Sequence, residues 1–108
     1  MIPTKEKNKL NALLVSVAYK DIEIYDDKHM ETLNDHYREY SSIINVLYRK
    51  HPNVFGNLYN HQLKEIKDNK MSIKKSSSEL NRQENFTAYK ESIREAVEVT
   101  VDYMNEYI

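Results

Sequence analysis

The stretch that decides the fold is residues 29–50, HMETLNDHYREYSSIINVLYRK, in which apolar side chains recur at steps of three and four. Residues with this spacing lie on one side of an α-helix, so they predict a continuous apolar seam. The seam consists of Met30, Leu33, Tyr37, Tyr40, Ile44 and Leu47. It is widened by Ile43, Val46 and Tyr48 into a broad face, which favours a helical bundle over a narrow two-stranded coiled coil.

Composition agrees with an all-α protein. The chain has 108 residues, enough for one domain spanning residues 1–108. One Gly and two Pro are too few for the many turns of a β-rich fold of this length. The absence of Cys excludes disulfides and thiol catalysis, and a net charge of −1 gives no overall attraction to nucleic acid or membranes.

Before this seam, an apolar stripe from Leu10 to Tyr25 predicts a first helix over residues 5–25. Extending that stripe reaches His29, whereas the central seam begins at Met30, so the two are out of phase. Asp26 and Asp27 favour helix starts over helix interiors. A tight turn at residues 26–28 is therefore predicted, and a single bent helix is the alternative.

After the seam, Pro52 disfavours helical geometry at His51 and predicts the end of the central helix there. The segment 51–57, HPNVFGN, is interpreted as a loop, with Asn57 as the cap of a third helix. Residues 76–85 are mostly polar and predict either a loop or the frayed start of the next helix. Ser76 and Glu79 have capping-box spacing, which favours the helix start.

The last predicted helix spans Glu84 to Tyr107 and has two distinct faces. Its apolar face carries Phe86, Tyr89, Ile93, Ala96, Val97, Thr100, Tyr103, Met104 and Tyr107. The opposite acidic stripe carries Glu91, Glu95, Glu98, Asp102 and Glu106. Short connections place neighbouring helices antiparallel. The sequence thus predicts a small antiparallel bundle of four helices, or of three helices plus a loose third segment.

Catalysis and metal binding find little support in the sequence. A single Gly excludes glycine-rich phosphate loops, and no serine lies in a glycine-rich elbow. His29 and His36 lie near one face of the central helix, and Asp26 precedes His29 at a spacing found in di-metal bundles. Such a site needs two of these motifs and further acids. We therefore expect no enzyme, no cofactor and no metal, and keep a metal-binding bundle as an alternative.

The nine tyrosines are the most suggestive feature for function. Tyr is enriched at protein–protein interfaces, although it also suits the boundary of a core. Codons from an AT-rich genome would supply Tyr as well, and the richness in Lys, Asn and Ile points to such a bacterial or phage genome. The candidate partner-binding residues are Tyr37, Tyr40, Tyr48, Tyr103 and Tyr107.

A basic strip supports nucleic-acid binding as an alternative function. Residues 51–83 carry a net charge of +3, whereas residues 84–108 carry −4. The candidate phosphate-binding residues are Lys64, Lys67, Lys70, Lys74, Lys75 and Arg82. Lys outnumbers Arg by 12 to 4, which disfavours base readout, and a loop at 52–57 would be too long for a helix-turn-helix. Basic and acidic faces can instead complement each other within the fold or across a dimer.

Together these patterns predict a non-enzymatic interaction module, such as a small bacterial or phage regulator or inhibitor that binds another protein. A homodimer is plausible, because the seam and the last helix can continue across a two-fold axis. Residues 5–18 loosely resemble a secretory signal, but Asn11 interrupts their apolar run. No segment approaches the length of a membrane span, so we expect a cytoplasmic protein without membrane contact.

Overall fold

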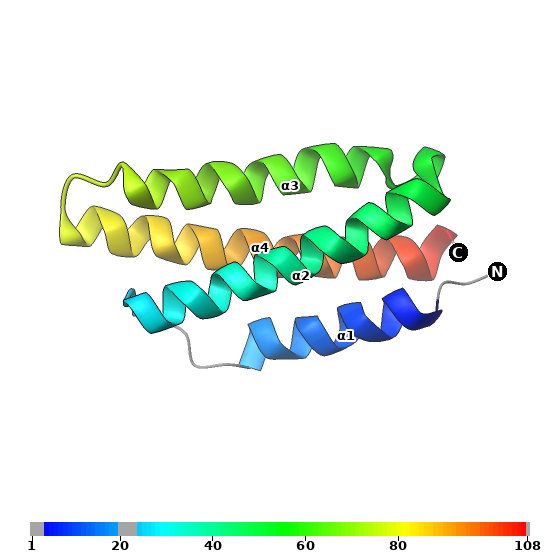
Figure 1. The fold of residues 1–108 in the computed structure, drawn as a ribbon, viewed down its shortest axis with the longest axis horizontal. Coiled ribbons are helices and arrows are strands. Elements are labelled where there is room, and N and C mark those ends of the chain that lie inside the picture. Colours follow the sequence, from blue (N-terminus) through cyan, green and yellow to red (C-terminus); the bar gives the residue numbers. More distant parts are fainter. Residues whose placement is uncertain (1–3, 20–23, 108) are drawn as a thin grey trace.

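The structure, a computed structural model of the whole chain, describes residues 4–19 and 24–107, with the side chains of Thr4, Ala18, Tyr19 and Tyr107 outside this description. The described residues form four helices and confirm the all-α prediction (Figure 1). These helices are α1 (Thr4–Tyr19), α2 (Asp27–Lys50), α3 (Pro52–Lys74) and α4 (Glu79–Tyr107). Of these, none combines the length and the hydrophobicity that crossing a lipid bilayer requires.

The helices form an antiparallel bundle organised around α4, which packs against each of the other three. Within the described residues α1 contacts α2 and α4 but not α3, so α1 and α3 occupy opposite corners. The bundle is 48 Å long, close to the roughly 44 Å that the 29 residues of α4 span as a helix. With only 16 residues, α1 covers part of that length.

The predicted seam of α2 lies in the core. Leu33, Tyr40, Ile44 and Leu47 are completely buried, whereas Met30 and Tyr37 are half-buried at its edge. The apolar face of α4 lies opposite them, from Phe86 to Met104. These seam residues pack inside one chain, so the seam offers little apolar surface to a second copy. A homodimer remains a prediction.

One buried hydrogen bond joins α2 to α4 within this core. The hydroxyl of Tyr40 lies 2.9 Å from Oγ1 of Thr100. Because Thr100 Oγ1 donates its own proton to the Ala96 carbonyl oxygen at 2.7 Å, Tyr40 is the donor in this pair. Both hydroxyls are therefore satisfied without water.

The predicted first helix over residues 5–25 is wrong at its end. Residues 24–26 are not helical, and residues 20–23 lie outside the described part. Asp26 has an extended backbone and its carboxylate accepts a hydrogen bond from the His29 amide at 2.7 Å, so it caps α2. The predicted break is confirmed, but α2 begins at Asp27. Tyr25 had been assigned to the helical stripe, and instead its ring meets Phe86 edge to face at 5.6 Å.

The predicted loop at 51–57 is also wrong. Only His51 separates α2 from α3, and Pro52 is the first residue of α3. Proline suits that position because a first-turn amide has no helical acceptor and the proline ring already holds a helical φ angle. Gly56 lies within α3, where a Cβ atom would stand 3.8 Å from the Tyr48 ring. Asn57 is inside the helix and does not cap it.

The third segment is a continuous helix from Pro52 to Lys74, so the four-helix version of the prediction is correct. The segment 76–85 is mostly helical. α4 begins at Glu79, five residues before the predicted start. The Ser78 hydroxyl accepts a hydrogen bond from the Asn81 amide at 3.1 Å, which makes Ser78 the cap instead of Ser76. Ser76 remains tied to the end of α3, because its hydroxyl donates to the Ser72 carbonyl oxygen at 3.0 Å.

Removing the Tyr40 hydroxyl should destabilise the protein without changing its fold. We expect Tyr40→Phe to lower the free energy of unfolding by about 1 kcal/mol at neutral pH, because one buried hydrogen bond is lost. Urea unfolding followed by circular dichroism measures this. The control is Tyr48→Phe, whose ring stacks on Tyr59 and which should change stability by less than about 0.5 kcal/mol. Equal effects of the two variants would contradict the assignment.

Alkaline pH should destabilise the bundle through the same residue. Burial raises the pKa of Tyr40 to about 12 from its ordinary value of 10.0, although the hydrogen bond with Thr100 lowers it. As pH rises, the unfolded chain therefore loses this proton before the folded protein does. The contribution of Tyr40 to the free energy of unfolding is complete below pH 10 and decreases as pH rises towards 12. Two pKa units correspond to about 3 kcal/mol. The free energy of unfolding, measured at several pH values across this range, should fall less steeply with pH for Tyr40→Phe than for the wild type. Equal slopes for the two proteins would contradict the prediction.

Candidate functional site

The five candidate tyrosines do not form one patch. Tyr40 is completely buried in the core, so its prediction as a partner-binding residue is wrong. Tyr48 is half-buried and stacks on Tyr59 of α3, with ring centroids 4.5 Å apart. Tyr103 lines a cavity of about 200 Å³ with Asn53, Val54 and Asn57, near the start of α3. The Tyr107 side chain lies outside the described residues.

Tyr37 is the tyrosine of this set that lies beside the basic strip. Its ring meets the Tyr89 ring edge to face, with centroids 6.4 Å apart. Lys70 of α3 places its Nζ 5.7 Å from the centroid of the Tyr37 ring. An aromatic ring carries partial negative charge on its face and attracts an ammonium group, by about 0.5–1 kcal/mol at an exposed position. Tyr37 therefore holds a cation at the α2–α3 boundary.

The predicted basic strip divides into two groups. Lys64, Lys67 and Lys75 are exposed and do not line the groove that the other three share. Of these, Lys64 borders an open hollow of about 300 Å³ that it shares with the carboxylates of Glu65 and Asp68. The other three cations, Lys70, Lys74 and Arg82, line a single groove.

We call this groove the basic groove, and it lies where α2 begins, α3 ends and α4 begins (left side of Figure 1). α2 and α3 are pinned together at His51 and diverge towards the opposite end of the bundle. The groove between the diverging halves has a volume of about 490 Å³. Its lining consists of Tyr25, Met30, Asn34, Lys70, Ile73, Lys74 and Arg82.

Two of the three cations of the basic groove, Lys70 and Arg82, are held by aromatic rings and not by carboxylates. Arg82 places its guanidinium carbon 5.7 Å from the centroid of the Tyr25 ring. Lys70 makes the same kind of contact with the Tyr37 ring. None of the ion pairs found among the described residues involves Lys70, Lys74 or Arg82. A ring contact restrains a cation without neutralising its charge. The groove therefore presents up to three uncompensated positive charges.

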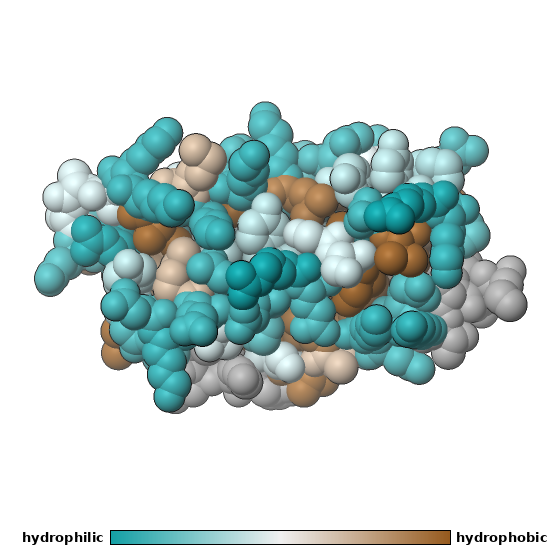
Figure 2. Space-filling view, in the orientation of Figure 1, coloured by the Kyte–Doolittle hydropathy of each residue, from teal (hydrophilic) through white to brown (hydrophobic). Residues whose placement is uncertain are grey.

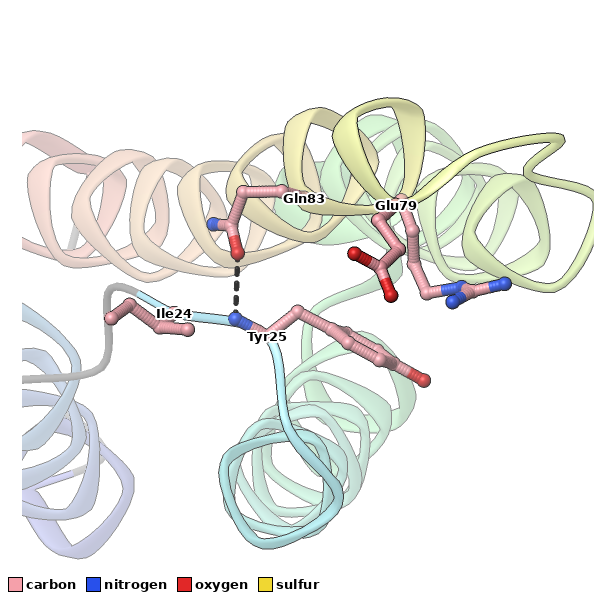
Figure 3. A pocket seen from close by; sticks show the side chains of 5 residues that line it. Ile24, Tyr25, Glu79 and Gln83 are labelled. Atoms are coloured by element: carbon pink, nitrogen blue, oxygen red, sulfur yellow. Dashed lines mark hydrogen bonds between the residues drawn. The ribbon is translucent and has the colours of Figure 1, made fainter.

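Tyr25 is fixed in place by α4. Its backbone amide donates a hydrogen bond of 2.7 Å to Oε1 of Gln83 (Figure 3), and its ring packs on Phe86. Tyr25 also lines a second hollow of about 360 Å³, which shares Arg82 with the basic groove and is further lined by Ile24, Glu79 and Gln83. Glu79 lines this second hollow and is not among the residues that line the basic groove.

Asn34 supplies the polar group of the groove wall on α2. Its Oδ1 accepts a hydrogen bond of 2.7 Å from the hydroxyl of Tyr89. Burial, followed by the neighbouring Tyr37, raises the pKa of Tyr89 well above its ordinary value, so this hydroxyl remains a donor across the physiological range. The Asn34 amide is thereby oriented, and its NH2 group is the donor end that remains for a ligand.

Sequence reasoning named the three cations but missed Tyr25 and Asn34. Tyr25 had been read as part of a helix. Asn34 is a single amide in a polar stretch, and no sequence pattern marks it as a binding residue. The spacing of Lys70 and Lys74, four residues apart, does predict that they share a face of α3. That Arg82 joins them depends on the turn between α3 and α4, whose geometry the periodicity does not encode.

The histidines do not build a metal site in the described part of the chain. His29 Nδ1 lies 2.8 Å from the Ile24 carbonyl oxygen and 3.2 Å from the Asp26 carboxylate, so it stabilises the start of α2. His36 is buried between the helices. Residues 4–19 and 24–107 contain no group of three His, Asp or Glu residues placed to hold a metal ion.

Comparison of the chain with protein-family models, with curated proteins and with solved structures finds no match.

Loss of the Gln83 side chain should free the segment that forms one wall of the groove. We expect Gln83→Ala to speed hydrogen exchange of the Tyr25 amide at least tenfold, because this amide then loses its acceptor, and to cost about 1 kcal/mol of stability. Glu84→Ala, at the neighbouring exposed position, is the control. Unchanged protection of the Tyr25 amide in Gln83→Ala would show that the bond does not hold the segment.

Proposed function

We propose that this protein is a non-enzymatic interaction module, a small bacterial or phage regulator or inhibitor that binds another protein in the cytoplasm. The observation that carries the proposal is the basic groove, which three cations without a carboxylate partner among the described residues line together with apolar side chains. A groove of this kind leaves its charges available to a ligand. Its volume falls within the range of roughly 300–1,000 Å³ that is typical of binding sites.

The residues that line the groove suit ligand binding better than catalysis. Its described lining contains neither a carboxylate nor an imidazole for general acid–base catalysis. Its walls come from three helices, and its aromatic anchors pack on buried residues of α4. Such a wall is ordered before a partner arrives, which lowers the entropy lost on association.

The remaining surface favours a polar mode of binding. Figure 2 shows small apolar patches separated by hydrophilic side chains on the face that it displays. A partner on this face therefore has to combine charge complementarity with a few apolar anchors. Tyr37, at the edge of the groove, provides an aromatic contact of the type enriched at interfaces.

Charge reversal in the groove tests the proposal. Tagged protein is added to extracts of its native host, and captured proteins are cross-linked and quantified. The wild type should retain a stoichiometric partner, and Lys70→Glu combined with Lys74→Glu should lose it by at least tenfold. The matched control is Lys64→Glu combined with Lys67→Glu, which makes the same charge change on the exposed face of the same helix.

Two results would overturn the proposed function. One is a wild-type protein that captures no stoichiometric partner and shows no effect on its host. The other is an equal loss of the partner in both double variants, because general charge would then explain the binding. Circular dichroism of each variant verifies that the bundle is intact.

Nucleic-acid binding is the second candidate, and the convergence of Lys70, Lys74 and Arg82 is the observation that favours it. The one-residue α2–α3 connection removes the loop length that argued against a helix-turn-helix. Binding to an oligonucleotide that weakens steeply as salt rises would favour this function.

A further inference from the structure

We infer that the basic groove receives an acidic segment of the partner protein, with carboxylates on the three cations and one large apolar side chain between them. The inference rests on the proposed function and deepens it, because it specifies the chemistry of the partner. It follows from the charges, the apolar lining and the geometry of the aromatic contacts.

The charges require an anionic occupant. Lys70 and Lys74 approach from α3 and Arg82 approaches from α4, so positive charge borders the groove on two sides. The like charges repel each other, and no carboxylate of the lining offsets this repulsion. An occupant with two or more carboxylates removes the repulsion and forms charge-assisted hydrogen bonds.

The apolar lining requires more than an anion. Met30 is half-buried and Ile73 is almost completely buried, and together with Tyr25 they supply the apolar part of the lining that the cations share. Water against this surface is released when an apolar side chain covers it. Full burial of a Leu or Phe side chain contributes enough to strengthen binding by about tenfold or more.

The aromatic contacts favour a peptide over nucleic acid. Unpaired bases bind proteins chiefly by stacking on exposed aromatic faces. The Tyr25 ring is in edge-to-face contact with Phe86, and the guanidinium of Arg82 lies over it. These two residues therefore already occupy the ring as a stacking surface. Phosphate recognition also favours several Arg forks, and the groove has one. The NH2 group of Asn34 suits a peptide carbonyl or carboxylate instead.

The size of the groove sets the length of the occupant. A volume of about 490 Å³ accommodates a few side chains of an extended segment, and it is too small for the flank of a whole helix bundle. This argues for a loop or tail of the partner. The acidic stripe of α4 in a second copy is rigid and helical, and so fits the groove less well.

Synthetic peptides test the inference on the full chain. The probe is a fluorescein-labelled twelve-residue peptide with two glutamates on each side of one leucine, in a Gly-Ser background. Binding is measured by fluorescence anisotropy at low salt. Three comparison probes replace the leucine by serine, replace all four glutamates by glutamine, or consist of a twelve-nucleotide oligouridine.

The expected results separate charge from apolar contact. The glutamine peptide should bind at least tenfold more weakly than the probe, and the serine peptide at least threefold more weakly. Lys70→Glu with Lys74→Glu should weaken the probe at least tenfold, whereas Lys64→Glu with Lys67→Glu should weaken it less than threefold. If the groove double variant does not fold, Lys74→Glu alone at its exposed position should still weaken binding at least threefold.

Several results would overturn the inference. They are absence of probe binding, equal binding of the serine and leucine peptides, equal losses in the two double variants, or tighter binding of oligouridine than of the peptide. Sedimentation at increasing protein concentration tests the second copy: self-association abolished by Lys74→Glu would assign the groove to a dimer contact and also overturn the inference.

The peptide experiment and the capture of a cellular partner can give different answers, so the inference and the proposed function are tested separately. A cellular partner that is lost on charge reversal, together with no response to the leucine or the glutamates of the probe, would leave the interaction module standing and refute the acidic segment. A probe that binds as expected, while the native host yields no partner, would support the acidic segment and refute the interaction module.

Discussion

The constraint on which the rest of the structure depends is the junction of α2 and α3, where His51 alone lies between two long helices. With no slack in the chain, the end of α2 and the start of α3 lie side by side, and the two helices can separate only towards their other ends. α4 packs along both and fills the bundle, while α1 is too short to cover its full length. The basic groove is the space that this divergence leaves between three helices.

The cations of that groove show how a small protein can hold charge ready for a partner. Carboxylate partners would fix Lys70 and Arg82 equally well, but they would cancel the charge. The rings of Tyr37 and Tyr25 restrain the same side chains and leave their electrostatic potential in place. The rings are themselves positioned by Tyr89 and Phe86 of α4, so the arrangement of the charges depends on the packing of the core.

Much of this fold could be predicted from periodicity, because burial of one helix face is what the step of three and four records. Leu33, Ile44 and Leu47 were identified in this way and are buried. Pro52 shows where such reasoning fails: α2 ends before it as predicted, but the loop expected at 51–57 is absent, because proline also suits the first turn of a helix and begins α3. Tyr40 shows a second limit, because Thr100, sixty residues away, satisfies its hydroxyl and allows full burial. The groove required knowledge of which helices are neighbours, so its cations could be named but not brought together.

The most direct test of this account is the environment of the Lys70 and Arg82 side chains in solution. Methylene protons held over an aromatic ring are shifted upfield in NMR spectra and show nuclear Overhauser effects to that ring. The account predicts such shifts, with contacts from Lys70 to Tyr37 and from Arg82 to Tyr25. Side chains with random-coil shifts and no contact to either ring would contradict it.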